Sequence, residues 1–103
     1  MIEWTDELIA RIDSSSRAAL SYLGESGYPV TLPLPCTFER VEHRFTLLRP
    51  GYSLATSVEA AGQTSLTLLS YNAQTGDERY LLFYGQVEKR GTGWSFTPSR
   101  VVL

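Results

Sequence analysis

Apolar side chains recur at every second position over most of the sequence after Arg17, and this period constrains the fold more than any other feature. In the segment 17–23, for example, Ala18, Leu20 and Tyr22 occupy alternate positions. Successive side chains of a strand point to opposite faces of a sheet, so a period of two predicts strands and not helices. The same argument predicts strands over 17–23, 30–34, 44–48, 64–71, 79–87 and 94–97. The chain is therefore expected to be mainly β.

Two short helices are predicted outside these strands. Thr5 can cap the first free amides of a helix over 5–12, and the two acidic residues that follow it suit the positive end of the helix dipole. A second helix is predicted over 52–61, where small and apolar residues recur at helical spacing before the stop signal Gly62.

Prolines and one glycine mark special positions in the predicted strands. Pro29, Pro33 and Pro35 flank the apolar residues of the strand 30–34 and cannot donate hydrogen bonds to a neighbouring strand. That strand is therefore expected at a sheet edge or a bulge, either protected from pairing or covered by a ligand or a second subunit. Gly85 interrupts a strongly β-forming run and predicts a bulge or a close backbone approach.

The strand 79–87 carries apolar residues on both faces. Tyr80, Leu82 and Tyr84 lie on one face, and Leu81, Phe83 and Val87 lie on the other. Burial of both faces is typical of a strand that lies in a barrel or at an interface between subunits.

The length of the chain limits this fold to one domain. With 103 residues, the chain can bury one modest core. We expect a single domain over 1–103, with a helical segment in 1–13 and a β-barrel over 17–103. The segment 38–42 is expected to connect two strands of that barrel.

The charge balance argues against two classes of partner. The formal net charge is -2 and Lys89 is the only lysine, whereas nucleic-acid binding needs clustered basic side chains. No apolar run approaches the roughly 20 residues that a membrane-spanning helix needs. We therefore expect neither a nucleic-acid partner nor a membrane partner.

The single cysteine and the single histidine provide little catalytic chemistry. Cys36 has no second cysteine to pair with, which is typical of a reducing compartment and predicts a cytoplasmic location. Its apolar surroundings in sequence predict a small buried side chain. His43, even with Glu39 or Glu42, would make only part of a metal site, and no nucleophile motif surrounds it. We predict no metal ligand and no catalytic side chain.

The order of the predicted elements resembles one known family. The stretches that carry the resemblance are the hairpin around Gly27 leading into 30–34, the strand 45–48 with the turn 49–53, the strand 80–86, and the closing 94–102 with its Trp94 and its Thr-Pro-Ser-Arg-Val ending. Over roughly residues 17 to 102, the chain is similar to the FMN-binding split-barrel family, the pyridoxamine 5'-phosphate oxidase-like proteins.

This resemblance implies a six-stranded Greek-key split barrel that forms a homodimer, with FMN or another flat small molecule in grooves between the subunits. Matched by position, it implies that Arg49, Ser53, Thr46 and Thr56 bind the cofactor phosphate. Arginine suits a phosphate because it makes paired, charge-assisted hydrogen bonds. The family implies a flavin-dependent oxidoreductase, in which the cofactor carries out the hydride or electron transfer.

A second hypothesis stays open beside the first. The segment 52–61 contains neither Lys nor Arg, although relatives commonly carry a basic residue there. The alternative is a non-catalytic dimeric split-barrel module that has lost the flavin. An oligonucleotide-binding barrel is a third choice, which the acidic balance disfavours. The residues do not distinguish FMN from a deazaflavin or a haem.

Overall fold

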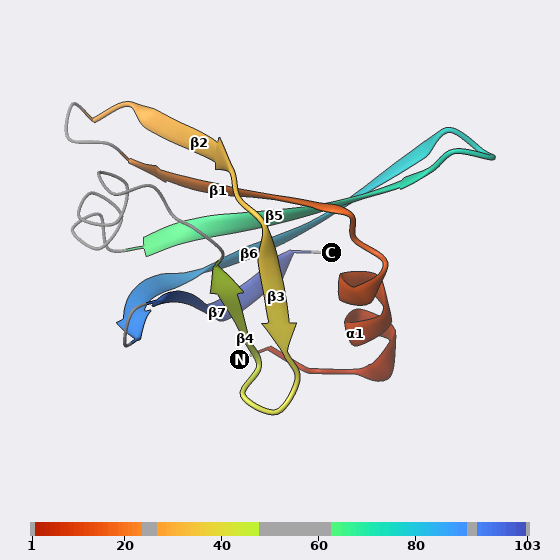
Figure 1. The fold of residues 1–103 in the computed structure, drawn as a ribbon. Coiled ribbons are helices and arrows are strands. Elements are labelled where there is room, and N and C mark those ends of the chain that lie inside the picture. Colours follow the sequence, from red (N-terminus) through yellow and green to blue (C-terminus); the bar gives the residue numbers. More distant parts are fainter. Residues whose placement is uncertain (1, 24–26, 48–62, 91–92, 103) are drawn as a thin grey trace.

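One antiparallel sheet of seven strands and one helix make up the part of the chain that the structure, a computed structural model, describes: residues 2–23, 27–47, 63–90 and 93–102. In chain order the elements are α1 (Asp6–Asp13), β1 (Arg17–Leu23), β2 (Pro29–Pro33), β3 (Cys36–Glu39), β4 (Arg44–Leu47), β5 (Gln63–Asn72), β6 (Asp77–Arg90) and β7 (Gly93–Val102) (Figure 1). The prediction of a mainly β fold is confirmed. The predicted helix over 52–61 lies outside the described residues.

The strand order explains why the sheet curls. The order is β2-β1-β5-β6-β7-β4-β3, so β2 and β3 stand at opposite ends of the sheet. Only Leu34 and Pro35 connect these two strands, and the two ends must therefore approach each other. The Leu34 amide also donates to the Ala18 carbonyl at 2.9 Å, which holds the connection against β1. The result is a curled, half-barrel sheet whose concave side encloses the core (Figure 1).

The proline-rich strand lies at a sheet edge, as predicted. β2 pairs with β1 alone among the described strands. Pro33 and Pro35 stand on either side of Leu34, and neither can donate a ladder hydrogen bond. The two prolines therefore interrupt strand pairing where the chain ends its pairing with β1, at the end of β2, and continues into β3.

The predicted connection over 38–42 is wrong in its first part, because Phe38 and Glu39 belong to β3. This short strand pairs with β4, with Phe38 opposite Phe45. The register of β3 depends on its pairing with residues distant in the chain and on the half-buried Phe38. A run of four residues directly after two prolines shows too little alternation for a strand to be predicted from the sequence. The turn follows at residues 40–43 and ends on His43, which has a positive φ of 54°.

The core consists of apolar residues that face one another across paired strands. Leu20, Leu66 and Phe83 are neighbours on β1, β5 and β6 and are at most 1% exposed. The ring of Phe45 lies 5.2 Å from that of Phe83 and 6.3 Å from that of Phe96, measured between centroids. Burying an aromatic side chain of this kind contributes about 1.5–3 kcal/mol. The three phenylalanine rings therefore connect β4, β6 and β7 on the inner side of the curled sheet.

Helix α1 closes one end of this core. Thr5 caps it, with the Thr5 Oγ1 accepting a hydrogen bond from the Leu8 amide at 3.1 Å, and Leu8 and Ile12 are buried. The predicted helix is thus confirmed with a shift of one residue. Trp4, just before the cap, stacks on His43 with 4.6 Å between ring centroids and so ties the helix to the β3–β4 turn. No helix among the described elements is long and apolar enough to cross a membrane.

Gly85 stands at an irregularity in the β6–β7 pairing, as the sequence predicts. The register shifts between Tyr84 and Gly85, and Gly85 lies opposite Pro98. A Cβ atom at Gly85 would meet the Thr97 carbonyl oxygen at 2.1 Å. Only glycine permits this close backbone approach.

The two faces of β6 differ in exposure. Leu81, Phe83 and Val87 are buried in the core, so the predicted burial of this face is confirmed. On the other face, Tyr80 is 56% exposed and Leu82 is only half-buried. The described residues therefore cover one face of this strand fully and the other face in part.

Candidate functional site

Only one of the four predicted phosphate-binding residues lies in the part of the chain that the structure describes. Thr46 lies in β4 and is described, whereas Arg49, Ser53 and Thr56 lie outside the described residues. The role of these three residues in phosphate binding stays a prediction.

Thr46 lies in an acidic environment. Its hydroxyl donates to Glu39 Oε1 at 2.9 Å, and beside it the Arg44 guanidinium forms an ion pair with Glu42. These side chains border a hollow of about 330 Å³ between the β3–β4 hairpin and β7. A phosphate bound at Thr46 would have to replace Glu39 as the partner of the hydroxyl.

Ser95 borders the same hollow from β7. It is 3% exposed, and its hydroxyl has no hydrogen-bond partner in the described part of the molecule. Leaving a buried hydroxyl unpaired costs about 1–3 kcal/mol. Ser95 and Thr46 are cross-strand neighbours, so the hollow has two hydroxyl groups side by side at its base.

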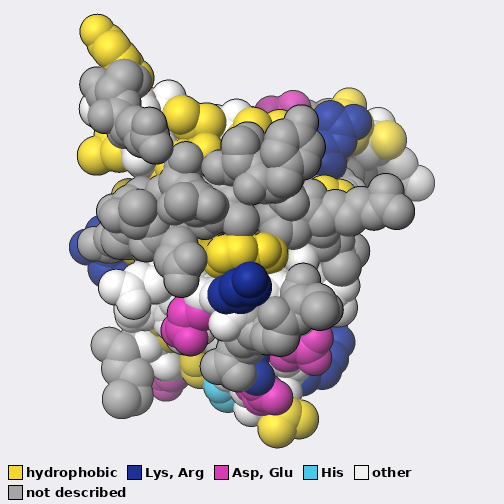
Figure 2. Space-filling model, turned by 60° about the vertical axis from the view of Figure 1, so that its left-hand side comes forward, with side chains coloured by type: hydrophobic (Ala, Val, Ile, Leu, Met, Phe, Trp, Pro, Cys, Tyr) yellow, Lys and Arg dark blue, Asp and Glu magenta, His cyan; other side chains and the backbone are white. Residues whose placement is uncertain are grey.

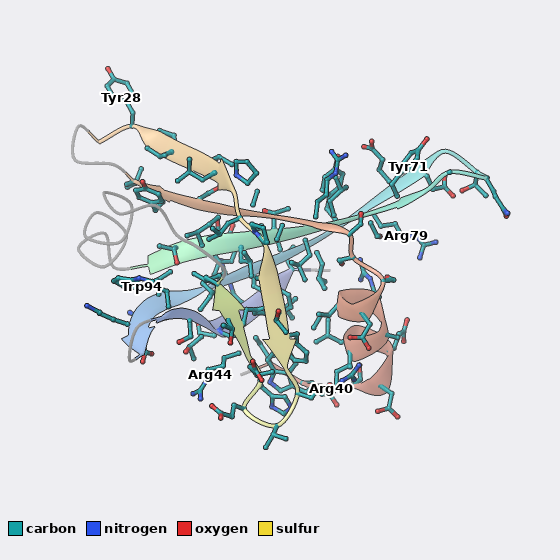
Figure 3. All side chains as sticks on the ribbon, viewed as in Figure 1. Tyr28, Arg40, Arg44, Tyr71, Arg79 and Trp94 are labelled. Atoms are coloured by element: carbon teal, nitrogen blue, oxygen red, sulfur yellow. The ribbon has the colours of Figure 1, made fainter. Side chains whose placement is uncertain are left out.

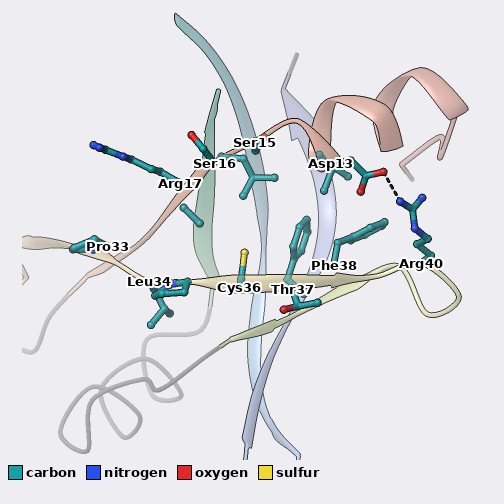
Figure 4. Close-up of a pocket in the computed structure, with 15 residues that line it drawn as sticks. Asp13, Ser15, Ser16, Arg17, Pro33, Leu34, Cys36, Thr37, Phe38 and Arg40 are labelled. Atoms are coloured by element: carbon teal, nitrogen blue, oxygen red, sulfur yellow. Dashed lines mark hydrogen bonds and ion pairs between the residues drawn. The ribbon is translucent and has the colours of Figure 1, made fainter. Parts of the chain in front are cut away.

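A larger cavity than this hollow lies elsewhere, between the end of α1, the start of β1 and the bend from β2 to β3. Its volume is about 640 Å³. Figure 4 shows Cys36 in the middle of this space, Arg17 at one end, and the ion pair of Asp13 with Arg40 at the other. Sequence reasoning missed Asp13, Arg17 and Arg40. The one signal for this location was the proline-rich edge, which we expected to be either protected or covered.

Cys36 is the reactive group nearest the centre of this cavity. Its side chain is half-buried and packs against the core, so the predicted small apolar role is confirmed in part. Burial raises the pKa of the Cys36 thiol to about 11, because desolvation disfavours the thiolate. The thiol is therefore neutral near physiological pH and is no candidate nucleophile.

This shift predicts the pH dependence of Cys36 alkylation. With iodoacetamide, the rate should rise about tenfold per pH unit from about pH 7 to about pH 10, since only the thiolate reacts. An unstructured peptide carrying one cysteine is the control, and its rate should level off above about pH 8.5. Stopped alkylation followed by mass spectrometry gives both rates. A Cys36 profile that levels off with the peptide would contradict the burial of the thiol.

His43 has a structural role in the described contacts. Its ring stacks nearly parallel on Trp4, with an interplanar angle of 14°, and its backbone amide donates to the Glu39 carbonyl at 2.8 Å. Across the described residues, no group of three or more His, Cys, Asp or Glu side chains is placed to hold a metal ion.

The convex face of the sheet carries an outer apolar patch, which we define as Tyr80, Leu82, Tyr84 and Val102. The strand register places Leu82 beside Val102, and Tyr84 beside Arg100. The Arg100 guanidinium lies 4.4 Å from the centre of the Tyr84 ring, a cation–π contact. Tyr80 and Val102 are 56% and 46% exposed.

Two further features of the surface bear on possible partners. The β5–β6 hairpin projects beyond α1 and carries Tyr71 and Arg79 (Figure 3). On the face in Figure 2, acidic and basic side chains are interspersed and do not gather in one basic surface.

Comparisons of the sequence with known proteins provide no family assignment. No family model matches the chain, and no curated protein matches it. The amino-acid sequence alone therefore leaves the family resemblance as a hypothesis.

Comparisons of the structure do find matches. One is the crystal structure of a protein from Bacteroides thetaiotaomicron that is proposed to confer resistance to 5-nitroimidazole antibiotics, with a TM-score of 0.70 and 10% identity over 98% of this chain and 84% of that one. A second solved structure matches with a TM-score of 0.65 and 18% identity, over 88% of this chain and 64% of that one. At these identities the matches establish a shared fold, the curled antiparallel β-sheet.

Proposed function

We propose that this chain is an FMN-binding split-barrel protein of the pyridoxamine 5'-phosphate oxidase-like type, which works as a homodimeric flavin-dependent oxidoreductase. The observation that carries the proposal is the bend between β2 and β3. Only Leu34 and Pro35 separate β2 from β3. If these two are counted as one bent strand, the seven-stranded sheet corresponds to the six strands that the family resemblance implies. FMN would supply the hydride or electron transfer, and the chain would bind and orient it.

The structural neighbour also supports a flavin-dependent reaction. Its fold covers nearly the whole of this chain, and its proposed link to 5-nitroimidazole antibiotics points to an electron-poor nitroheterocycle as the first substrate to assay. A reduced flavin can deliver electrons to such an acceptor. Fold similarity alone does not determine chemistry, so the assay must be done with FMN present and with FMN absent.

The phosphate site provides the sharpest test of cofactor binding. Arg49→Ala should weaken FMN binding at least tenfold, about 1.4 kcal/mol, because it removes a charge-assisted pair of hydrogen bonds to the phosphate. Quenching of flavin fluorescence on titration measures the Kd. Arg79→Ala, which removes an exposed arginine from β6, is the matched control and should leave the Kd unchanged. Equal affinities for Arg49→Ala and the unmodified protein would remove Arg49 from the site.

The outer apolar patch is the proposed dimer contact. Light scattering on a sizing column should give about twice the protomer mass of 11.5 kDa. Leu82→Glu should lower this to the protomer mass, since it places a charge in the centre of the patch. Val41→Glu, at a turn residue that is 94% exposed, should leave the dimer intact. A protomer mass for the unmodified chain at micromolar concentration would contradict the dimer.

A flavin-free binding module is the second candidate, and a specific contact favours it. The Thr46 hydroxyl already has Glu39 as its acceptor, and the segment 52–61 contributes no basic side chain. This candidate predicts a colourless protein whose midpoint of thermal unfolding does not change with excess FMN, because a ligand that does not bind the native state cannot stabilise it.

A further inference from the structure

The cavity around Cys36 has the size and lining of a small-molecule site. Its volume of about 640 Å³ falls within the range of about 300–1,000 Å³ that is typical of ligand pockets. It lies within one protomer, and Thr46, the one predicted phosphate-binding residue that the structure describes, is not among its lining residues.

Part of the wall of this cavity is apolar, and Ser15, Ser16 and Thr37 line it with polar side chains. Ala18 on β1 and Cys36 and Phe38 on β3 are half-buried and line the space, with the buried side chains of Phe45 and Leu68 behind them. A neutral thiol behaves as a small apolar group in such a wall. An apolar ligand body that displaced water from these side chains would be stabilised in proportion to the apolar area that it covered.

The charges at the two ends of the cavity differ. At one end the Arg40 guanidinium is neutralised by Asp13. At the other end Arg17 is exposed and forms no ion pair with any described residue. These three side chains leave one net positive charge, located at the Arg17 end (Figure 4).

We infer that this cavity binds an amphipathic monocarboxylate, with its apolar body against Cys36 and Phe38 and its carboxylate at Arg17. The guanidinium provides charge-assisted hydrogen bonds to a carboxylate, and these give an anion an advantage over a neutral or cationic molecule with the same body. Pro33 and Pro35 border the cavity from the β2–β3 bend. The proline-rich edge would thus be covered by a ligand.

Cys36 provides a direct readout of occupancy, because it is the only cysteine of the chain and it lines the cavity. Modification by the neutral reagent methyl methanethiosulfonate is followed by mass spectrometry, with decanoate, decanol or decylamine added below their micelle concentrations. Saturating decanoate should slow the modification at least fivefold. The half-maximal concentration of decanoate should be at least tenfold below those of decanol and decylamine. No protection by decanoate, or equal protection by all three probes, would overturn the inference.

Two arginine variants test the position of the carboxylate. Arg17→Gln should raise the half-maximal decanoate concentration about tenfold and bring it close to that of decanol. Arg79→Gln, which removes an exposed charge outside the cavity, should leave it unchanged. Equal effects of the two variants would remove Arg17 from the site. None of these results depends on whether FMN binds elsewhere.

Discussion

Phe83→Ala is expected to lower the free energy of unfolding by about 3–5 kcal/mol, the range for a phenylalanine removed from a packed core. Phe83 is fully buried, and its ring centroid lies 5.2 Å from that of Phe45 and 6.1 Å from that of Trp4. Its removal leaves a cavity where β6 meets both β4 and the segment before α1. Trp4 would lose one of its stacking partners at the same time.

Equilibrium unfolding in urea measures this loss. Val41→Ala is the control, since Val41 is 94% exposed, and it should change the free energy of unfolding by less than about 0.5 kcal/mol. A loss in the free energy of unfolding below about 1 kcal/mol for Phe83→Ala would contradict the position of Phe83 at the centre of the core.

Gly85→Ala is expected to lower the free energy of unfolding by about 3 kcal/mol, at the upper end for overpacking. The added methyl group would lie 2.1 Å from the Thr97 carbonyl oxygen and 2.8 Å from the Pro98 Cα. Both contacts are with backbone atoms, so no side chain can rotate away to relieve them. Either β6 and β7 move apart at this bulge or the sheet loses part of its pairing.

Gly76 provides the matched control for Gly85. It has a positive φ of 75°, but a Cβ atom there would meet no atom within 4 Å. Gly76→Ala should therefore cost only about 1–2 kcal/mol, from backbone conformation alone. Gly76→Asn should cost less, since asparagine tolerates that conformation. Equal losses for Gly85→Ala and Gly76→Ala in the same urea experiment would contradict the close approach of β6 to β7.

Local features of the sequence predicted most of the fold correctly. Thr5 as a helix cap, the alternation in β1 and the irregularity at Gly85 each depend on residues close together in the chain. Strand β3 could not be predicted in this way. Its pairing of Phe38 with Phe45 depends on the curl of the sheet, and the curl depends on the order of all seven strands.

The candidate sites were harder to predict, for a related physical reason. Asp13 and Arg40 come from the end of α1 and from the β3–β4 turn, and no sequence pattern relates two such positions. The acidic surroundings of Thr46 arise because β3 places Glu39 next to β4. The sequence predicted the second half of β3 as a connection and not as a strand. The family resemblance implied Thr46 as a phosphate ligand without this neighbour.

The folded chain is expected to bind FMN, and a thermal unfolding series with increasing FMN tests this binding. A ligand that binds only the native state stabilises it by about 2.7 kcal/mol at a concentration of 100 times the Kd. The midpoint of unfolding should therefore rise steadily with FMN, and flavin absorption bands should stay with the protein on a desalting column. A midpoint that stays constant up to millimolar FMN, with a colourless protein fraction, would contradict FMN binding by the folded chain.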